Sequence, residues 1–363
     1  MRNNFNTSAF SELAFEIRDD PAEGWFRFTG TARYSPHRGL SSRIGPALLG
    51  TLKSARDFSY QLRDSLATRG PSDGQAEQEL SPLDLALTGL GSCSMKTLIG
   101  GGSARGVTFE GVELSTLLTS QRSAEDAPRD AMCYSVDCLF EVNTSASQEL
   151  MTELLEQVQE FSPNHRTLTD EMPLTVNFRG SNIWAAAGRY DAQGPAPTVP
   201  TPVERRIGWI TGTQFESWPP GLPTAVRVPV DSPKQLTGAD WGPNAQEHLL
   251  MGLAADIASH LNYFSVRDLG TSLPWEVTAT ASIDAAGMLD TGESLVGLQD
   301  TTCSISFLGE EEAAAATDLR LVVDQAVKSS TVRTLLTEPS VVDVSLKSGY
   351  AGASTRRIGR RTS

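Results

Sequence analysis

Apolar positions along the chain follow both the two-residue period of strands and the longer runs of buried helices. Alternation over Trp25–Tyr34, and again over Trp209–Phe215, predicts a strand pair near the start of each half. A mostly apolar stretch with few charges follows each pair, at Leu83–Ile99 and at Ala245–Phe264. Helices with so few charges are usually buried, so each half is predicted to have a buried central helix.

Further elements are expected after each central helix. A helix over Ser147–Phe161 carries its apolar residues on one stripe, and the Gly100–Gly102 run is expected to stop the first central helix early. The remaining predicted strands are Val107–Leu118, Cys133–Val142, Leu174–Phe178, Trp275–Ile283, Thr302–Phe307 and Val341–Leu346. This order of elements predicts an α+β unit that occurs twice.

Short sequence matches also relate the two halves. The Thr-Gly-Thr at Thr29 recurs at Thr211, Gly89-Leu90 recurs as Gly252-Leu253, and Arg166-Thr167-Leu168 recurs as Arg333-Thr334-Leu335. The matches keep their order while their offset drifts, as expected of two diverged copies with an insertion in the first copy, near residues 47–75.

A proline-rich stretch over residues 185–205 separates the halves and is predicted to be an extended linker. The expected domains are therefore residues 1–184 and residues 206–348. Residues 349–363 hold several arginines and are predicted to be a basic, disordered tail.

Composition and charge exclude several classes of function. The chain has 363 residues, and 44 acidic against 30 basic residues give a net charge of −14, the wrong sign for a protein that neutralises nucleic-acid phosphates. No apolar run has the length of a membrane span, and the N-terminus lacks the order of a signal peptide. Four cysteines are too few for a disulfide scaffold. These features predict a soluble, cytoplasmic protein with neither nucleic-acid nor membrane partners.

Two motifs resemble those of one known family. Ser81-Pro82-Leu83-Asp84-Leu85-Ala86-Leu87-Thr88-Gly89-Leu90-Gly91-Ser92-Cys93 is similar to the signature of the OsmC and organic hydroperoxide resistance proteins, in which a helix led by proline delivers a reactive cysteine. Phe161-Ser162-Pro163 resembles the second motif, which holds a resolving cysteine before a proline. The resemblance implies two OsmC-like units in tandem, each a curved antiparallel sheet with a buried central helix. They would form a pseudodimer within one chain, and further oligomerisation stays open.

The resemblance also assigns candidate site residues in the first half. Cys93 is the candidate nucleophile, and Ser162 stands at the resolving position, where it cannot form a disulfide. Asp84 lies next to the position of the family carboxylate. The family's activating arginine comes from the N-terminal region, for which Arg33 is the candidate, with Arg38 and Arg43 as alternatives. Without the resemblance, Cys93 is equally a small buried residue on an apolar helix.

The second half has lost the thiols. Its equivalents of Cys93 and Ser162 are Asp256 and Ser329, so no thiol chemistry is expected there. Asp256 and His260 lie four residues apart on one helix face and could form an acid–base pair, half a metal site or a satisfied polar pair. The chain offers no other short metal-ligand spacing, and the glycine run lacks the lysine of a phosphate loop, so no metal and no cofactor are expected.

The other cysteines and the insertion leave alternatives open. Cys133, Cys138 and Cys303 are expected to be packing residues, although Cys133 or Cys138 could resolve Cys93. The insertion near residues 47–75 carries spaced apolar residues and is predicted to be an amphipathic helix. It would reshape the first site or serve as structural cover.

Two functions follow from these expectations. In the first, Cys93 reacts with an organic hydroperoxide or another electrophile, and an external thiol reductant regenerates it. In the second, a repurposed pseudodimer without peroxidase activity binds or transforms a hydrophobic small molecule in a specialised pathway. The retained Cys93 favours the first function, and the missing resolving cysteine favours the second.

Overall fold

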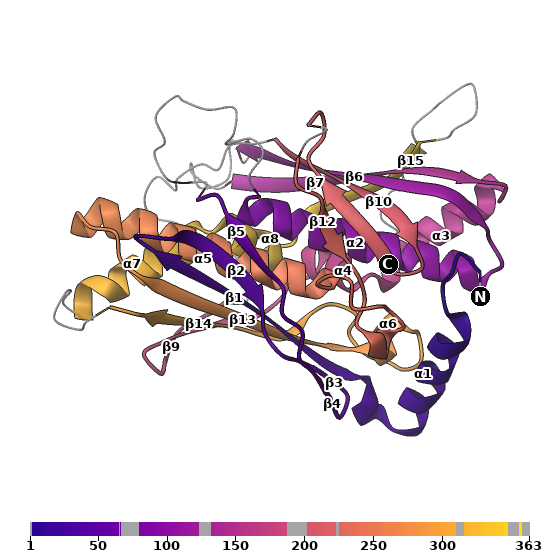
Figure 1. Ribbon diagram of the computed structural model, residues 1–363, viewed down its shortest axis with the longest axis horizontal. Helices are drawn as coiled ribbons and strands as arrows, with labels where there is room; N and C mark the ends of the chain where they lie inside the picture. The colour runs from indigo at the N-terminus through magenta and orange to yellow at the C-terminus, as the bar shows by residue number, and fades with distance from the viewer. Residues whose placement is uncertain are drawn as a thin grey trace.

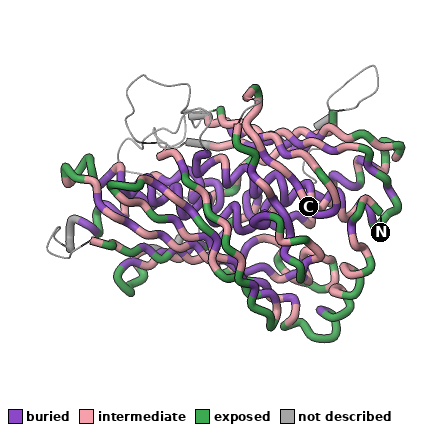
Figure 2. Tube along the Cα trace, in the orientation of Figure 1, coloured by how far each residue is buried: buried purple, intermediate pink, exposed green. Residues whose placement is uncertain are grey.

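Two long helices lie in a layer between two β-sheets. The structure is a computed structural model that describes residues 2–64, 66, 80–122, 132–186, 202–222, 225–309, 316–347 and 356–357. Figure 1 shows the helical layer with one sheet on each side of it. Buried residues follow this middle layer, while exposed residues lie on the outer loops and strand ends (Figure 2). No helix in the described ranges has the length and apolar character needed to cross a membrane.

The helices in chain order are α1 (Thr7–Asp19), α2 (Pro82–Ala104), α3 (Gln148–Phe161), α4 (Pro163–Thr169), α5 (Ala245–Leu269), α6 (Ala285–Met288), α7 (Ala316–Ser329) and α8 (Thr331–Thr337), with 3₁₀ turns η1 (Pro21–Gly24) and η3 (Lys234–Leu236). The two central helices, α2 and α5, both begin with a capping box. Ser81 and Asp84 satisfy each other's backbone N–H groups at the start of α2, and Asn244 and Glu247 do the same for α5.

The strands are β1 (Trp25–Ser35), β2 (Gly39–Ile44), β3 (Ala47–Leu49), β4 (Leu52–Ser54), β5 (Ser59–Leu62), β6 (Phe109–Arg122), β7 (Met132–Thr144), β8 (Leu174–Phe178), β9 (Ser181–Ala186), β10 (Val203–Thr211), β11 (Gln214–Trp218), β12 (Val228–Val230), β13 (Trp275–Asp284), β14 (Gln299–Phe307), β15 (Val341–Lys347) and β16 (Arg356–Arg357). One sheet has the order β4-β3-β1-β13-β14-β8-β9, with β2 and β5 continuing from β1. The other has the order β12-β11-β10-β6-β7-β15-β16.

Each sheet takes strands from both halves of the chain. In one sheet β1 pairs antiparallel with β13, and β8 pairs parallel with β14. In the other sheet β10 pairs antiparallel with β6, and β15 pairs parallel with β7. The two sheets therefore share these central pairings, although one has nine strands and the other seven, and neither half completes a sheet by itself. The architecture is α+β.

The central helices cross at very short range because glycines stand at the crossing. A Cβ atom on Gly89 would lie 2.6 Å from the carbonyl oxygen of Ala245, and a Cβ on Gly252 would lie 2.8 Å from the backbone nitrogen of Ala86. Such contacts are closer than van der Waals packing allows, so the backbones can approach only where side chains are missing. Gly89 and Gly252 occupy the same position on α2 and α5, counted from the capping residues.

Two sequence predictions about the helices were wrong. The Gly100–Gly102 run does not stop the first central helix, because α2 continues through it to Ala104. These glycines instead admit close neighbours, since a Cβ on Gly102 would lie 2.5 Å from the ring of Phe109. Helix α1 was not predicted, although Asn6 caps it and Phe10, Leu13 and Ile17 recur at helical spacing.

The described part of the insertion is not the predicted helix. It contains β3, β4 and β5, and β5 extends the sheet by pairing with β2. Residues 65 and 67–75 of the insertion, residues 187–201 of the expected linker, and most of the expected tail lie outside the described residues. Within the tail, Arg356–Arg357 form β16, which pairs with β15.

Candidate functional site

The Cys93 side chain lies on the wall of a cavity of about 570 Å³. The first half supplies residues from α1, α2 and α3, and the second half supplies residues from η3, the start of α5 and the region around α6. The lining residues are Phe5, Thr7, Phe10, Ser11, Ala14, Cys93, Lys96, Thr97, Gly100, Gly101, Ser103, Ala104, Gln157, Phe161, Pro163, Leu236, Gln246, Ile283, Met288, Leu289 and Asp290. The cavity is therefore built by both halves, and most of its wall is apolar.

Helix α2 presents one face to this cavity. Cys93, Lys96, Thr97, Gly100 and Ala104 recur at three- or four-residue spacing, which places them on a single stripe. The glycines leave room along the stripe, so the helix backbone itself forms part of the wall. The Phe5 and Phe10 rings, which also line the cavity, stack with centroids 4.8 Å apart, and the Phe5 ring lies against Gly100.

The sulfur of Cys93 accepts hydrogen bonds from both halves of the molecule. The Asn164 backbone N–H lies 3.5 Å from Sγ, and the Gln246 amide Nε2 lies 3.4 Å from it. The Asn164 side chain also donates to the carbonyl oxygens of Gly89, at 2.9 Å, and Ala245, at 3.1 Å. Asn164 thereby fixes α4 against both central helices and holds its N–H toward the thiol.

Burial and hydrogen bonding act on the thiol in opposite directions. Cys93 is only 3% exposed, and burial raises the pKa of its thiol because the charged form loses its solvation. The buried Ser162 hydroxyl, the Asn164 N–H and the nearby Lys96 charge lower this pKa, but by less. Ser162 thus lies beside the sulfur, where it stabilises the thiolate but cannot form a disulfide.

Lys96 is the cation next to the thiol, and the sequence analysis did not single it out. Burial lowers the pKa of its amine to about 8, while Cys93 and Asp231 favour its charged form. Its Nζ atom also lies 5.7 Å from the centroid of the Phe10 ring. A signal existed in the sequence, because Asp84 and Lys96 are the charged residues of the otherwise uncharged α2.

The structure places Arg33 away from this cavity. Arg33 lies on the outer face of β1, where its side chain is 55% exposed and pairs with Glu276. The inner face of β1 packs on α5 rather than on α2: a Cβ on Gly30 would lie 2.4 Å from the backbone nitrogen of Met251. The alternatives Arg38 and Arg43 are also exposed and do not line the cavity.

A different arginine reaches the start of α2. Arg205, on β10 of the second half, is buried, with its Nη1 atom 3.8 Å from Oδ1 of Asp84. Its Nε atom donates to the Ser217 hydroxyl at 3.1 Å. Asp84 therefore caps α2 and pairs with a cation from the opposite half. Sequence reasoning missed Arg205 because it searched only the first half.

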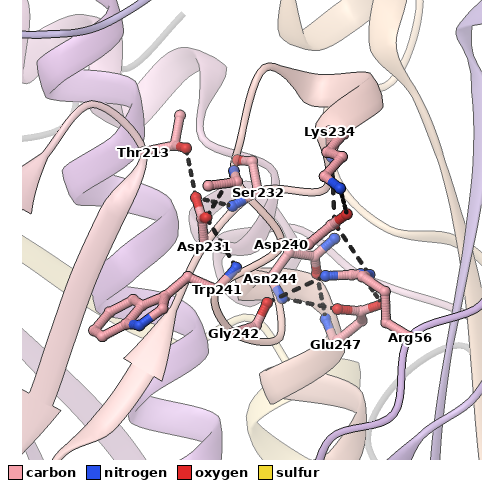
Figure 3. A network of polar contacts seen from close by, with 11 residues as sticks. Arg56, Thr213, Asp231, Ser232, Lys234, Asp240, Trp241, Gly242, Asn244 and Glu247 are labelled. Atoms are coloured by element: carbon pink, nitrogen blue, oxygen red, sulfur yellow. Dashed lines mark hydrogen bonds and ion pairs between the residues drawn. The ribbon is translucent and has the colours of Figure 1, made fainter.

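A similar pair lies at the start of α5. The buried carboxylate of Glu247 contacts Arg56 of the first half, whose Nη1 donates to the Gly242 carbonyl oxygen at 3.1 Å. Asp240 lies on the other side of the same guanidinium, 3.7 Å from Nε. Figure 3 shows Arg56 between these two carboxylates.

The loop after β12 is held by a single buried carboxylate. Asp231 accepts hydrogen bonds from the Thr213 hydroxyl at 2.6 Å and from the backbone N–H groups of Ser232, Ala239 and Trp241 (Figure 3). These bonds close the loop and hold Leu236 in place as part of the Cys93 cavity wall.

In the second half, the Asp256 carboxylate takes the position of the Cys93 thiol. Its Oδ2 atom accepts hydrogen bonds from the Ser330 hydroxyl at 2.6 Å and the Val332 N–H at 2.9 Å. Ser330 is the capping residue of α8, as Ser162 precedes α4, so the counterpart of Ser162 is Ser330. The assignment of Ser329 was wrong by one residue, because Ser329 is the last residue of α7.

His260 lies beside Asp256 in the buried interior. Its Nδ1 atom is 2.8 Å from the Asp256 carbonyl oxygen and 3.6 Å from Oδ1 of the carboxylate. The Asp256 carboxylate is already engaged by Ser330 and Val332. This geometry is that of a buried structural pair, and among the described residues no group of three side chains could hold a metal ion.

The described part of the insertion covers this second region rather than the first. Asp64 accepts hydrogen bonds from the Ser259 hydroxyl and, at 3.0 Å, from the Asn262 amide, both on α5. Ser259 stands on α5 where Lys96 stands on α2, counted from the capping residues. The expectation that the insertion reshapes the Cys93 site was therefore wrong for its described residues.

The remaining cysteines with described side chains lie in the core. Cys138 on β7 and Cys303 on β14 are fully buried, and burial raises the pKa of each thiol to about 12. Neither lines the Cys93 cavity. Cys133 belongs to β7, but its side chain lies outside the described residues.

Comparison with known proteins points to one family. Residues 74–177 match the family model described as OsmC-like protein. Among solved structures, the chain is similar to an OsmC-like protein from Mycoplasma pneumoniae, with 19% identity, 38% of this chain and 84% of that chain covered, and a TM-score of 0.26. No curated protein matches the chain.

Proposed function

We propose that the chain, whose residues 74–177 match the OsmC-like family model, is a one-cysteine thiol oxidoreductase that reduces organic hydroperoxides at Cys93. The observation that carries this proposal is the Cys93 sulfur on the wall of a largely apolar cavity of about 570 Å³. A thiol in the interior of a core would have no room for a substrate, whereas this cavity has room for a small apolar one.

The hydrogen bonds at Sγ support the same chemistry. The thiolate is the nucleophile in peroxide reduction, and groups that donate to it stabilise it. Asn164 and Gln246 both direct N–H groups at Sγ. Because Ser162 stands beside the sulfur, an external thiol must reduce the sulfenic acid that forms on Cys93.

The proposal extends to the arrangement of the whole chain. Its two halves act as two OsmC-like units, residues 1–184 and 206–348, that pair as a pseudodimer. The repeated order of elements, the two interleaved sheets and the glycines at the helix crossing support this view. The first unit then keeps the reactive thiol, while the second completes the cavity wall with Gln246, Leu236 and Met288.

Turnover of cumene hydroperoxide in the presence of excess dithiothreitol tests the function. Wild-type protein is expected to consume the hydroperoxide, and Cys93→Ser is expected to reduce consumption to the uncatalysed rate. Cys303→Ser is the matched control, because Cys303 is equally buried but does not line the cavity. Equal rates for wild type and Cys93→Ser would refute the proposal.

One observation favours a second candidate function, the binding of a hydrophobic small molecule without thiol chemistry. Burial raises the pKa of Cys93, which opposes formation of the thiolate. In that case Cys93→Ser would bind an apolar fluorescent probe such as 8-anilinonaphthalene-1-sulfonate as tightly as wild type, and neither protein would consume hydroperoxide.

A further inference from the structure

Lys96 and Cys93 form a pair on one face of α2. They are three residues apart, so their side chains leave the helix on the same side, and both line the same cavity. The titratable residues on the wall of that cavity are Cys93, Lys96 and Asp290. The amine is thus the cationic group that shares this partly open, mostly apolar space with the thiol.

The buried arginine is engaged elsewhere. Arg205 contacts Asp84 and Ser217 near the start of α2, and it does not line the cavity. Arg33 is exposed and pairs with Glu276. Neither residue lines the cavity that holds the Cys93 sulfur, whereas Lys96 does.

The second half provides an internal comparison. Where Cys93 is replaced by Asp256, the position of Lys96 is held by Ser259, which donates a hydrogen bond to Asp64. The thiol and the amine are therefore present together on α2 and replaced together on α5. Such a joint replacement is expected of two residues that act together. As evidence for the pair, it does not depend on the pKa of either group.

We propose that Lys96 is the proton-transfer partner of Cys93: its amine accepts the thiol proton, and its ammonium returns a proton to the leaving group of the substrate. Lys96 suits this role because burial brings the pKa of its amine to about 8, so both protonation states are populated near neutral pH. The groups that act on this amine are Cys93 and Asp231, with Asp290 on the same cavity wall.

The return of a proton to the leaving group rests on the proposed function and follows from the chemistry of peroxide reduction. The Cys93 thiolate attacks the distal oxygen of a hydroperoxide, so that an S–O bond forms and the O–O bond breaks. The sulfur is oxidised to a sulfenic acid, and the peroxide is reduced to an alkoxide, which takes a proton from the Lys96 ammonium and leaves as an alcohol. One external thiol then condenses with the sulfenic acid to form a mixed disulfide and releases water, and a second external thiol attacks this disulfide, which frees the Cys93 thiol and forms the disulfide of the reductant.

Alkylation of Cys93 by iodoacetamide between pH 6 and 10, followed by mass spectrometry of the Cys93 peptide, tests the proton-accepting role without any hydroperoxide. Lys96→Met keeps an apolar stem against Phe10 but removes the amine. It is expected to slow alkylation at pH 8 by about 10-fold or more and to move the midpoint of the pH profile upward, since one pKa unit is a tenfold change in thiolate. Lys96→Arg restores a cation that cannot accept a proton near neutral pH, so its alkylation is expected to stay at least about 3-fold slower than in the wild type, which separates proton transfer from charge stabilisation alone.

The controls separate this role from a structural one. Lys53→Met changes an exposed lysine on β4 and is expected to leave the profile unchanged. Lys96→Gln replaces Lys96→Met if the latter does not fold, as judged by circular dichroism. A folded Lys96→Met or Lys96→Gln with the wild-type rate and midpoint would overturn the inference, as would a Lys96→Arg variant as fast as the wild type. If Cys93 consumes no hydroperoxide but its alkylation still depends on Lys96, the proposed function fails while the pairing of Lys96 with Cys93 stands.

Discussion

The two central helices carry different chemistry at the same point along their length. On α2, the Cys93 sulfur borders a cavity and accepts two long hydrogen bonds, at 3.4 and 3.5 Å. On α5, the Asp256 carboxylate accepts two short hydrogen bonds, at 2.6 and 2.9 Å, from the residues that begin α8. In both places one of the two donors is a backbone N–H in the first turn of a short helix, that of Asn164 in α4 and that of Val332 in α8. A buried serine precedes each of these helices.

The difference shows how one backbone arrangement serves two purposes. The Cys93 sulfur borders a cavity, whereas the Asp256 carboxylate ties α5 to α8 through its hydrogen bonds. The second half thus has a hydrogen-bonded carboxylate at the position where the first half has a thiol beside a cavity. The two positions are therefore expected to lose very different amounts of stability on substitution.

The largest expected effect on stability comes from Asp256. Asp256→Ala removes the acceptor for Ser330 and Val332 and leaves buried donors unsatisfied, so it is expected to lower the free energy of unfolding by about 4 kcal/mol. Cys93→Ser, at the matching position on α2, is expected to lower it by less than about 1 kcal/mol. Urea unfolding followed by circular dichroism measures both variants. Equal losses would show that the two positions have the same role.

A second difference between the helices is titratable. His248 of α5 is fully buried and contacts the Pro229 carbonyl oxygen at 3.1 Å, while its counterpart on α2 is the apolar Leu85. Burial lowers the pKa of His248 to about 4. Between pH 6.5 and 4 the unfolded chain therefore binds a proton that the folded chain does not, and stability is lost as the pH falls through this window.

His248→Gln keeps a donor for Pro229 but removes the titration. The wild type is expected to lose about 3 kcal/mol more stability than this variant between pH 7 and pH 4. Urea unfolding at the two pH values gives the difference. His37→Gln, which changes an exposed histidine, serves as the control. Parallel losses in wild type and His248→Gln would remove this contrast between α5 and α2.

The smallest expected effect concerns the glycine that each central helix has at the crossing. Gly89→Ala and Gly252→Ala each place a Cβ against backbone atoms of the other helix, so each is expected to lower stability by about 2 kcal/mol. Gly111→Ala on β6, where a Cβ would meet open space, is expected to change it by less than about 0.5 kcal/mol. Thermal unfolding compares the three variants. A large loss for one crossing glycine alone would contradict an equivalent crossing.

Much of the fold could be predicted from local patterns. The alternation over Trp25–Tyr34 and Leu174–Phe178 marked two strands, and the stripe in Ser147–Phe161 marked α3 with its serine cap. These elements were predictable because their periodicity reports burial on one face. The glycine run at Gly100–Gly102 misled the prediction, because its residues make room for packing partners that are distant in sequence.

The candidate site was harder to predict, because long-range pairing decides it. The motif around Pro82 marked Cys93, and the proline after Ser162 marked the neighbouring serine. The partner of Asp84 could not be predicted within one half, since the interleaved sheets bring Arg205 from the other half to α2. The cavity wall includes Gln246 and Met288 for the same reason.

The central claim is that, among the cysteines whose side chains the structure describes, Cys93 is the reactive one and lies at a cavity built by both halves. Trapping of sulfenic acid with dimedone during treatment with cumene hydroperoxide, followed by mass spectrometry of each cysteine peptide, tests it most directly. The account predicts about one label per chain, at Cys93, with Cys138 and Cys303 unlabelled because both are buried away from the cavity. A chain that acquires no label at Cys93, or acquires label at Cys138 and Cys303 at the same rate, would contradict the account.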